Sequence, residues 1–163
     1  MADGDDTQDL NDTQDLAPWS NLKADAPEIN FPFGVTARIV ANAARTHGAF
    51  GMIEAVYPPG QGFPMHIHHN EDEFQYILEG KLLIVSGDTR VVAGPGDFFF
   101  GPKGLPHGFK SVGDVPARFL EGVLPGGLEA LMTTPALMIA AVVVGHSGPP
   151  FNFEIVGPAP EMT

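Results

Sequence analysis

The chain has 163 residues, a length that suits one domain with a sizeable core and is too short for two. Its net charge of -12 disfavours nucleic acids and anionic membrane surfaces as partners, because an acidic protein repels phosphate groups. The chain has no cysteine, which excludes disulfides and thiolate ligands, and no apolar run approaches the ~20 residues of a membrane helix, so we expect a cytoplasmic protein.

The N-terminal segment is acidic and is predicted to lie outside the folded domain. The first 28 residues hold eight acidic side chains and a single lysine, and Asp6–Leu10 is repeated as Asp12–Leu16. A segment of this composition buries little apolar surface. We therefore expect residues 1–27 to form a mobile arm, which Trp19 and Leu22 anchor on the domain or on a neighbouring subunit.

Residues 28–126 are predicted to form an all-β barrel. Short alternating segments are separated by glycine and proline, and the 20 glycines and 16 prolines of the chain imply many turns. The predicted strands are 36–43, 49–57, 65–69, 73–78, 81–86, 89–92, 97–100, 107–112 and 117–123. Hairpin turns are predicted at Glu79-Gly80 and Gly87-Asp88. This spacing favours an antiparallel barrel or sandwich.

Residues 127–163 are predicted to form a short helix and a tail that pack on the barrel. Thr134 and Pro135 form a helix-start pair, with threonine as the cap and proline at the first helical position. Gly145 is the expected stop. A last short strand is predicted over residues 153–156.

Three histidines and one glutamate are candidate metal ligands. His66 and His68 alternate along a predicted strand, so their side chains point the same way and that of His69 points the opposite way. After a polar turn, Glu73 opens the next strand and is expected to face back across the hairpin. His107 begins a distant strand and is expected to close the site from another wall of the barrel.

This set of three imidazoles and one carboxylate suits Fe, Ni, Co, Mn, Cu or Zn better than Ca or Mg. An octahedral ion would keep two positions for a substrate or O2, whereas a tetrahedral zinc would be saturated and structural. We therefore expect one divalent transition metal ion per chain, whose identity the ligand set does not select. The alternative is a set of surface histidines on a polar hairpin.

The spacing around these residues resembles the cupin superfamily. The first cupin signature is reproduced by Gly60, His66, His68, Glu73 and Gly80, and the second by Gly96, Pro102, Gly104 and His107. From residue 37 to residue 128 the chain resembles single-domain cupins related to quercetin dioxygenase. That resemblance rests on the segments His66–Glu73, Tyr76–Gly80, Gly96–Pro102 and Pro125–Glu129. It implies a cupin jelly-roll barrel, or double-stranded β-helix, with a short C-terminal helix.

The resemblance also implies a role for each candidate. His66, His68, Glu73 and His107 would be metal ligands, and Glu73 would be the catalytic base of a dioxygenase. It would take a proton from a flavonol-like or other enolisable aromatic substrate before O2 opens the ring. Two alternatives remain, because cupins support many reactions. They are a metal-dependent isomerase or cyclase of a polyketide-like substrate, and a non-catalytic cupin that binds a small molecule.

The expected partners are a small apolar or aromatic molecule and a second copy of the chain. Large apolar side chains lie on the predicted strands, and about half of them should face the cavity. These candidates are Met52, Phe63, Met65, Phe74, Tyr76, Leu83, Phe98, Phe100, Phe109 and Phe119. Cupins often pair through N-terminal strands, and the apolar stretch Ile29–Phe33 favours a homodimer here.

Overall fold

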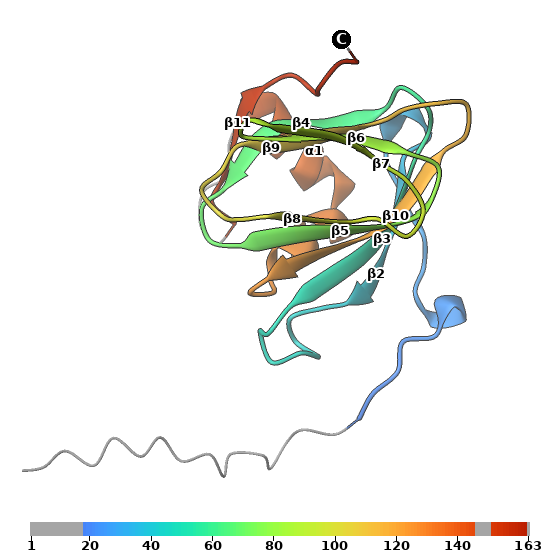
Figure 1. The fold of residues 1–163 in the computed structure, drawn as a ribbon. Helices are drawn as coiled ribbons and strands as arrows, with labels where there is room; N and C mark the ends of the chain where they lie inside the picture. The colour runs from blue at the N-terminus through green and yellow to red at the C-terminus, as the bar shows by residue number, and fades with distance from the viewer. Residues whose placement is uncertain (1–17, 146–150, 163) are drawn as a thin grey trace, which may run out of the picture.

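The computed structural model describes residues 18–145 and 151–162. Two antiparallel sheets face each other across the core (Figure 1). The larger sheet has the order β1 (Ile29–Asn30), β2 (Thr36–Ala41), β3 (Gly51–Tyr57), β10 (Ala117–Leu124), β5 (Asp72–Glu79) and β8 (Phe98–Gly101). The smaller has the order β11 (Phe153–Gly157), β4 (Gly62–His68), β9 (His107–Ser111), β6 (Leu82–Ser86) and β7 (Thr89–Ala93). The predicted fold class, an all-β jelly-roll barrel with a short C-terminal helix, is confirmed.

The turns divide into those within one sheet and those that cross between sheets. β6 pairs with β7, so the hairpin predicted at Gly87-Asp88 is confirmed. The hairpin predicted at Glu79-Gly80 is wrong, because β5 and β6 belong to different sheets. Gly80 is required there for a different reason. It adopts φ 67°, and a Cβ atom would lie 2.4 Å from the carbonyl oxygen of Pro116.

Four short helices complete the described part of the chain: η1 (Lys23–Asp25), η2 (Pro32–Gly34), η3 (Leu128–Thr133) and α1 (Pro135–Val144). The bounds of α1 match the prediction. Pro135 is its first residue, and Gly145 ends it in the left-handed region at φ 89°. The side chain of Thr134 makes no capping hydrogen bond. In Figure 1, α1 lies behind the space between the two sheets, across one end of the barrel.

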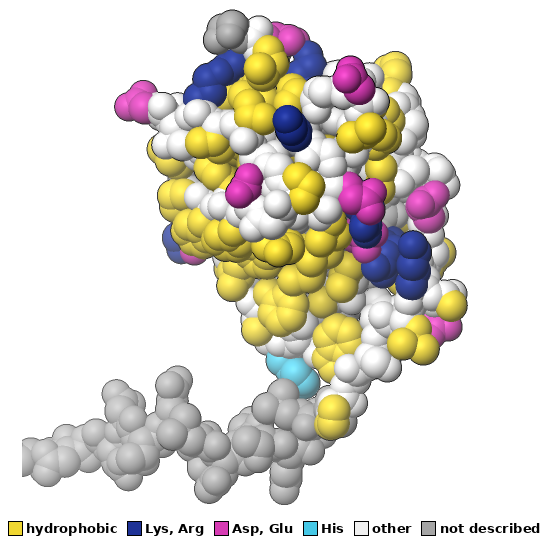
Figure 2. Space-filling view, turned by 45° about the vertical axis from the view of Figure 1, so that its right-hand side comes forward, with side chains coloured by type: hydrophobic (Ala, Val, Ile, Leu, Met, Phe, Trp, Pro, Cys, Tyr) yellow, Lys and Arg dark blue, Asp and Glu magenta, His cyan; other side chains and the backbone are white. Residues whose placement is uncertain are grey.

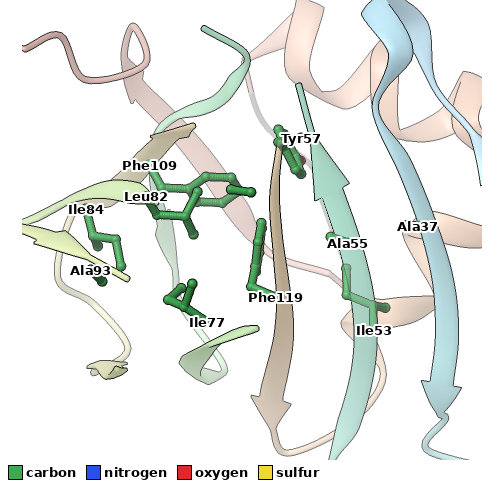
Figure 3. Packing of buried hydrophobic residues seen from close by; sticks show 11 residues of the cluster. Ala37, Ile53, Ala55, Tyr57, Ile77, Leu82, Ile84, Ala93, Phe109 and Phe119 are labelled. Atoms are coloured by element: carbon green, nitrogen blue, oxygen red, sulfur yellow. The ribbon is translucent and has the colours of Figure 1, made fainter. Parts of the chain in front are cut away.

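The main hydrophobic core fills the space between the two sheets, and several of its residues also line the cavity beneath α1. Figure 3 shows Phe109, Phe119, Ile77 and Leu82 pointing toward one another from both sheets. Phe119 is fully buried, and its ring meets that of Phe109 edge to face, with centroids 5.3 Å apart. Tyr57 makes a similar contact with Phe109 at 5.0 Å. These contacts hold β3 and β10 against β9.

The outer face of the larger sheet is also apolar. Tyr76, Phe98 and Phe100 point outward and are 40%, 61% and 50% exposed. The ring of Phe74 covers Gly122 and stacks on Phe98 at 5.7 Å. Figure 2 shows apolar side chains over the lower half of the folded body, the level at which this sheet lies in Figure 1. We call Phe74, Tyr76, Phe98 and Phe100 the outer aromatic face. These four belong to the half of the candidate cavity residues that turns outward.

The predicted arm over residues 1–27 lies outside the described residues up to residue 17. In its described part, the ring of Trp19 lies under the guanidinium of Arg45 at 5.9 Å. The side-chain amide of Asn21 donates to the carbonyls of Ile39 and Val40, whereas Leu22 is exposed. None of the helices in the described ranges is long and apolar enough to cross a membrane. The cytoplasmic location stays a prediction.

Candidate metal centre

The four candidate ligands meet between the two sheets, near the end that α1 covers. His66 and His68 lie on β4, and His107 lies on β9 directly opposite His66. Glu73 enters from β5, in the other sheet. All four residues are buried, and one ligand atom from each lies within 4.8 Å of the others. We call these residues the His–Glu cluster.

The strand arrangement differs from the expected one in two respects. β4 and β5 do not form a hairpin, so Glu73 faces the histidines from the opposite sheet rather than across a turn. His107 does not come from another wall, because β9 pairs with β4. The alternation within β4 is as expected. His69 turns away, with a half-exposed side chain 3.5 Å from the carboxylate of Glu154.

The ligand atoms of the cluster are close enough together to bind one metal ion. The Nε2 atoms of His66 and His68 are 3.0 Å apart, and Glu73 Oε2 lies 3.0, 3.5 and 4.0 Å from the Nε2 atoms of His68, His107 and His66. Ligand atoms about 2.1 Å from one ion are about 3.0 Å apart in adjacent octahedral positions and about 4.2 Å apart in opposite ones, whereas all tetrahedral pairs are about 3.4 Å apart. The measured distances of 3.0 to 4.0 Å lie within the range that these arrangements span, so the four residues could hold one ion.

The outward nitrogens of the histidines fix the direction of their rings. His66 Nδ1 lies 2.8 Å from the carbonyl oxygen of Pro64, and His107 Nδ1 lies 3.0 Å from that of Leu105. Each Nδ1 donates there, so each Nε2 points into the cluster with a free lone pair when the ring is neutral. His68 Nδ1 has a buried carboxylate oxygen of Glu71 at 3.9 Å and no hydrogen-bond partner. Glu71 is therefore the residue best placed to orient His68.

The pKa values of the cluster residues are shifted in different directions. Burial and the charge of His107 lower the pKa of His66 to about 3, which keeps this ring neutral. Burial opposes ionisation of Glu73, but the charge and hydrogen bonds of His107 and His68 hold its pKa well below the usual range. Burial also opposes the charge on His107, yet Glu73 raises its pKa to about 9. At neutral pH the cluster thus joins an ionised carboxylate to a neutral His66 and a protonated His107, whose proton a metal ion would displace on binding. It could hold one divalent transition metal ion.

The cluster opens onto a cavity of about 290 Å³. The cavity is lined mainly by apolar side chains. Phe63 and Phe109 come from the barrel, Phe33 from η2, and Met138 and Val142 from α1. This volume is close to the lower end of the range, about 300–1,000 Å³, of small-molecule sites. Of the ten predicted lining residues, the structure places Met52, Phe63 and Phe109 at this cavity.

Two polar residues of the site were not singled out from the sequence. Glu121 on β10 lines the cavity, and burial together with the charge of Glu73 raises its pKa well above the usual range. Gln75 on β5 lies between the two carboxylates. Its side-chain nitrogen donates to Glu73 Oε1 at 3.2 Å and to Glu121 Oε2 at 3.4 Å. Strand alternation starting from Glu73 could have predicted that Gln75 faces inward. No sequence signal could have placed Glu121, because its position depends on the pairing of β10 with β5.

Comparisons with known proteins agree with this architecture. Residues 53–123 match the family model described as Cupin domain. Quercetin 2,3-dioxygenase of Bacillus subtilis is 30% identical over 74 residues, which are 45% of this chain and 22% of that enzyme. The chain likewise spans 55% of the length of an uncharacterized protein of Methanocaldococcus jannaschii, MJ1618.

Solved structures show the same fold. KdgF from a Halomonas species superposes with a TM-score of 0.61 and 16% identity, over 68% of this chain and 96% of that chain. The polyketide cyclase RemF from Streptomyces resistomycificus superposes with a TM-score of 0.55 and 27% identity, over 66% of this chain and 80% of that chain. Residues 53–123, which include the whole His–Glu cluster, therefore match a cupin domain.

Proposed function

We propose that the chain is a metal-dependent dioxygenase that cleaves a flavonol-like or other enolisable aromatic compound with O2. The observation that carries this proposal is the position of Glu73. Its Oε2 atom faces three buried histidines, and the cluster opens onto an apolar cavity. The similarity to a quercetin 2,3-dioxygenase over 74 residues supports the reaction class.

Four residues of the chain would hold a metal ion, and one of them would also accept a proton. His66, His68, Glu73 and His107 would hold one divalent metal ion, which when bound supplies Lewis acidity that stabilises a substrate oxyanion. Glu73 is the base that takes the acidic O–H proton of the substrate. Gln75 holds the other oxygen of Glu73, Oε1, through its 3.2 Å hydrogen bond and so directs Oε2 toward the reacting centre.

The cavity supplies orientation and excludes water. An aromatic substrate would contact Phe63 and Phe109 in the barrel, and Met138 and Val142 of α1 would cover it. O2 provides both oxygen atoms that enter the product, and the organic substrate provides the electrons. No external reductant is therefore required.

The test is oxygen uptake by protein reconstituted in turn with Fe(II), Ni, Co and Mn and supplied with quercetin. Glu73→Ala is the variant that should abolish uptake, and His69→Ala is the matched control, because His69 lies next to the cluster in sequence but faces outward. Uptake that requires both a metal and Glu73 supports the proposal. No uptake with any metal, in protein that holds one ion per chain, rejects the dioxygenase reaction.

A metal-dependent cyclase or isomerase of a polyketide-like substrate is the second candidate. Its support is the similarity to the polyketide cyclase RemF, which extends over a larger share of both chains than the similarity to the dioxygenase. Glu73 would act as the same base, but O2 would not be consumed. Anaerobic conversion of an enolisable polyketide model compound, with Glu73 still required, would favour this reaction.

A further inference from the structure

Five glutamates with little or no exposure to bulk water lie in the described part of the barrel, and four have an evident role. Glu54 receives hydrogen bonds from Arg38 and Arg118. Glu129 accepts the backbone N–H groups of Ala43 and Gly127, both at 2.7 Å. Glu71 lies beside His68, and Glu73 belongs to the His–Glu cluster. Glu121 alone has no such role.

Glu121 reaches the cavity from the wall next to Glu73. On the paired strands β10 and β5, Val123 lies opposite Glu73 and Glu121 lies opposite Gln75. The two glutamates are therefore diagonal neighbours on the inner face, with backbone positions about 7–8 Å apart. A single amide nitrogen, that of Gln75, contacts both carboxylates. Glu121 thus lines the same cavity as His66, His68 and Glu73, within reach of a molecule bound at the cluster.

The hydrogen bonding of Glu121 is incomplete. Its Oε2 atom accepts one long bond, 3.4 Å, from Gln75, and no other described residue donates to either oxygen. The surrounding cavity wall is largely apolar, and its few polar side chains, Tyr57 and Gln61 among them, make no hydrogen bond to Glu121 in the described part of the chain. A carboxyl group in such surroundings is costly unless a hydrogen-bond partner arrives. In Glu129, by contrast, two backbone donors meet this need within the fold.

We propose that Glu121 is a specificity-determining residue that accepts a hydrogen bond from a ring hydroxyl of the substrate, separate from the oxygen that reaches the His–Glu cluster. The substrate class is then an aromatic compound with at least two hydroxyl groups on one fused ring system. This inference rests on the small-molecule site of the proposed function, but not on its reaction with O2.

The experiment compares two probes in Zn(II)-loaded protein under anaerobic conditions, so that no turnover occurs. Quercetin carries several ring hydroxyls besides the metal-binding pair, and 3-hydroxyflavone lacks them. Dissociation constants are measured by calorimetry for the wild type, Glu121→Leu and Glu121→Gln, and zinc affinity is measured for each. We expect the wild type to prefer quercetin by up to about tenfold, which is the upper end of the value of one hydrogen bond between neutral groups.

In Glu121→Leu the preference should fall to about one, with the affinities for 3-hydroxyflavone and zinc retained. Glu121→Gln keeps the shape, and it should lower the preference by a smaller factor. The proposal is overturned if either variant keeps the full preference, or if the wild type shows none or binds neither probe. Equal weakening of both probes together with zinc would instead assign Glu121 a structural role through Gln75. Failure of oxygen uptake would leave a measured preference intact, so the two proposals fail separately.

Discussion

The two faces of the larger sheet reverse the usual pattern of an antiparallel sheet, in which the apolar face is buried and the polar face meets water. On the inner face near the cluster, β5 and β10 present Glu73, Gln75 and Glu121 to the barrel interior. On the outer face, the same part of β5 and its neighbour β8 present the outer aromatic face. The reversal is local, because Ile77 and Phe119 farther along the same strands are buried in the apolar core.

Both faces carry a free-energy cost that a binding partner would relieve. Buried carboxylates are costly without compensating charges and donors, and large exposed aromatic groups are costly in water. Inside the barrel, an ion in the His–Glu cluster and a hydroxylated ligand at Glu121 would supply the compensation. Outside it, a second copy of the chain would cover the aromatic rings. We therefore propose both faces of this sheet as binding surfaces.

Loss of a cluster residue should have the largest effect. Glu73→Ala and His66→Ala each remove one of four ligands, so the metal content after dialysis should fall from one ion per chain to nearly none. The loss should exceed the about 10–100-fold that removal of a residue outside the ligand set costs. Elemental analysis measures it. Tyr76→Ala, which alters the outer face of the same strand, should keep its ion, and equal loss in that variant would contradict the assignment.

Truncating a buried side chain of β10 should lower the free energy of unfolding more than truncating its neighbour on the outer face. Phe119 is fully buried, and Phe119→Ala should lower the free energy of unfolding by about 3–5 kcal/mol. Leu120 is the next residue on β10 and points outward, so Leu120→Ala should cost clearly less. Urea unfolding of metal-free protein measures both variants. Similar losses would mean that the outer face is packed as tightly as the core.

The sequence predicts a homodimer that pairs through the stretch Ile29–Phe33, and the exposed outer aromatic face is a second candidate for the contact. We expect the double variant Phe98→Asp and Phe100→Asp to weaken self-association by about 30-fold, the effect of removing an interface hot spot. The matched control is Val91→Asp and Val92→Asp on β7, which are also exposed but lie in the other sheet. Light scattering after size-exclusion chromatography gives the mass. A monomeric wild type, or a dimer disrupted only by the control, would reject this interface.

Of these four predictions, the substitution of Glu71 should have the smallest effect. Its carboxylate lies 3.9 Å from His68 Nδ1, and both groups are buried. Glu71→Gln should weaken metal binding by about tenfold, because an outer carboxylate orients a ligating histidine and raises its basicity. Competition with a chromophoric chelator measures the affinity. Unchanged affinity would show that His68 keeps its orientation without this residue.

Much of the site could be predicted from local rules. Alternation along one strand places His66 and His68 on the same side and His69 on the other, as the structure has them. The same rule, started from Glu73, turns Phe74 and Tyr76 outward. Applied to residues 73–76, it would have removed both from the candidates for the cavity.

What could not be predicted depends on pairing between distant segments. The sequence does not reveal that β4 and β5 lie in different sheets, which decides the side from which Glu73 enters. It also does not reveal that His107 lies opposite His66, or that Glu121 lies opposite Gln75. The contribution of η2 and α1 to the cavity is equally non-local, since about 100 residues separate Phe33 from Val142.

We expect the His–Glu cluster to hold one ion and to leave positions free for a substrate. The most direct measurement is the visible absorption spectrum of Co(II)-loaded protein under anaerobic conditions, before and after addition of quercetin. We expect weak d–d bands, typical of six-coordinate Co(II), that shift when quercetin binds and that are absent in His66→Ala. Intense bands of tetrahedral Co(II) that do not respond to quercetin would contradict this expectation, because such a site is closed.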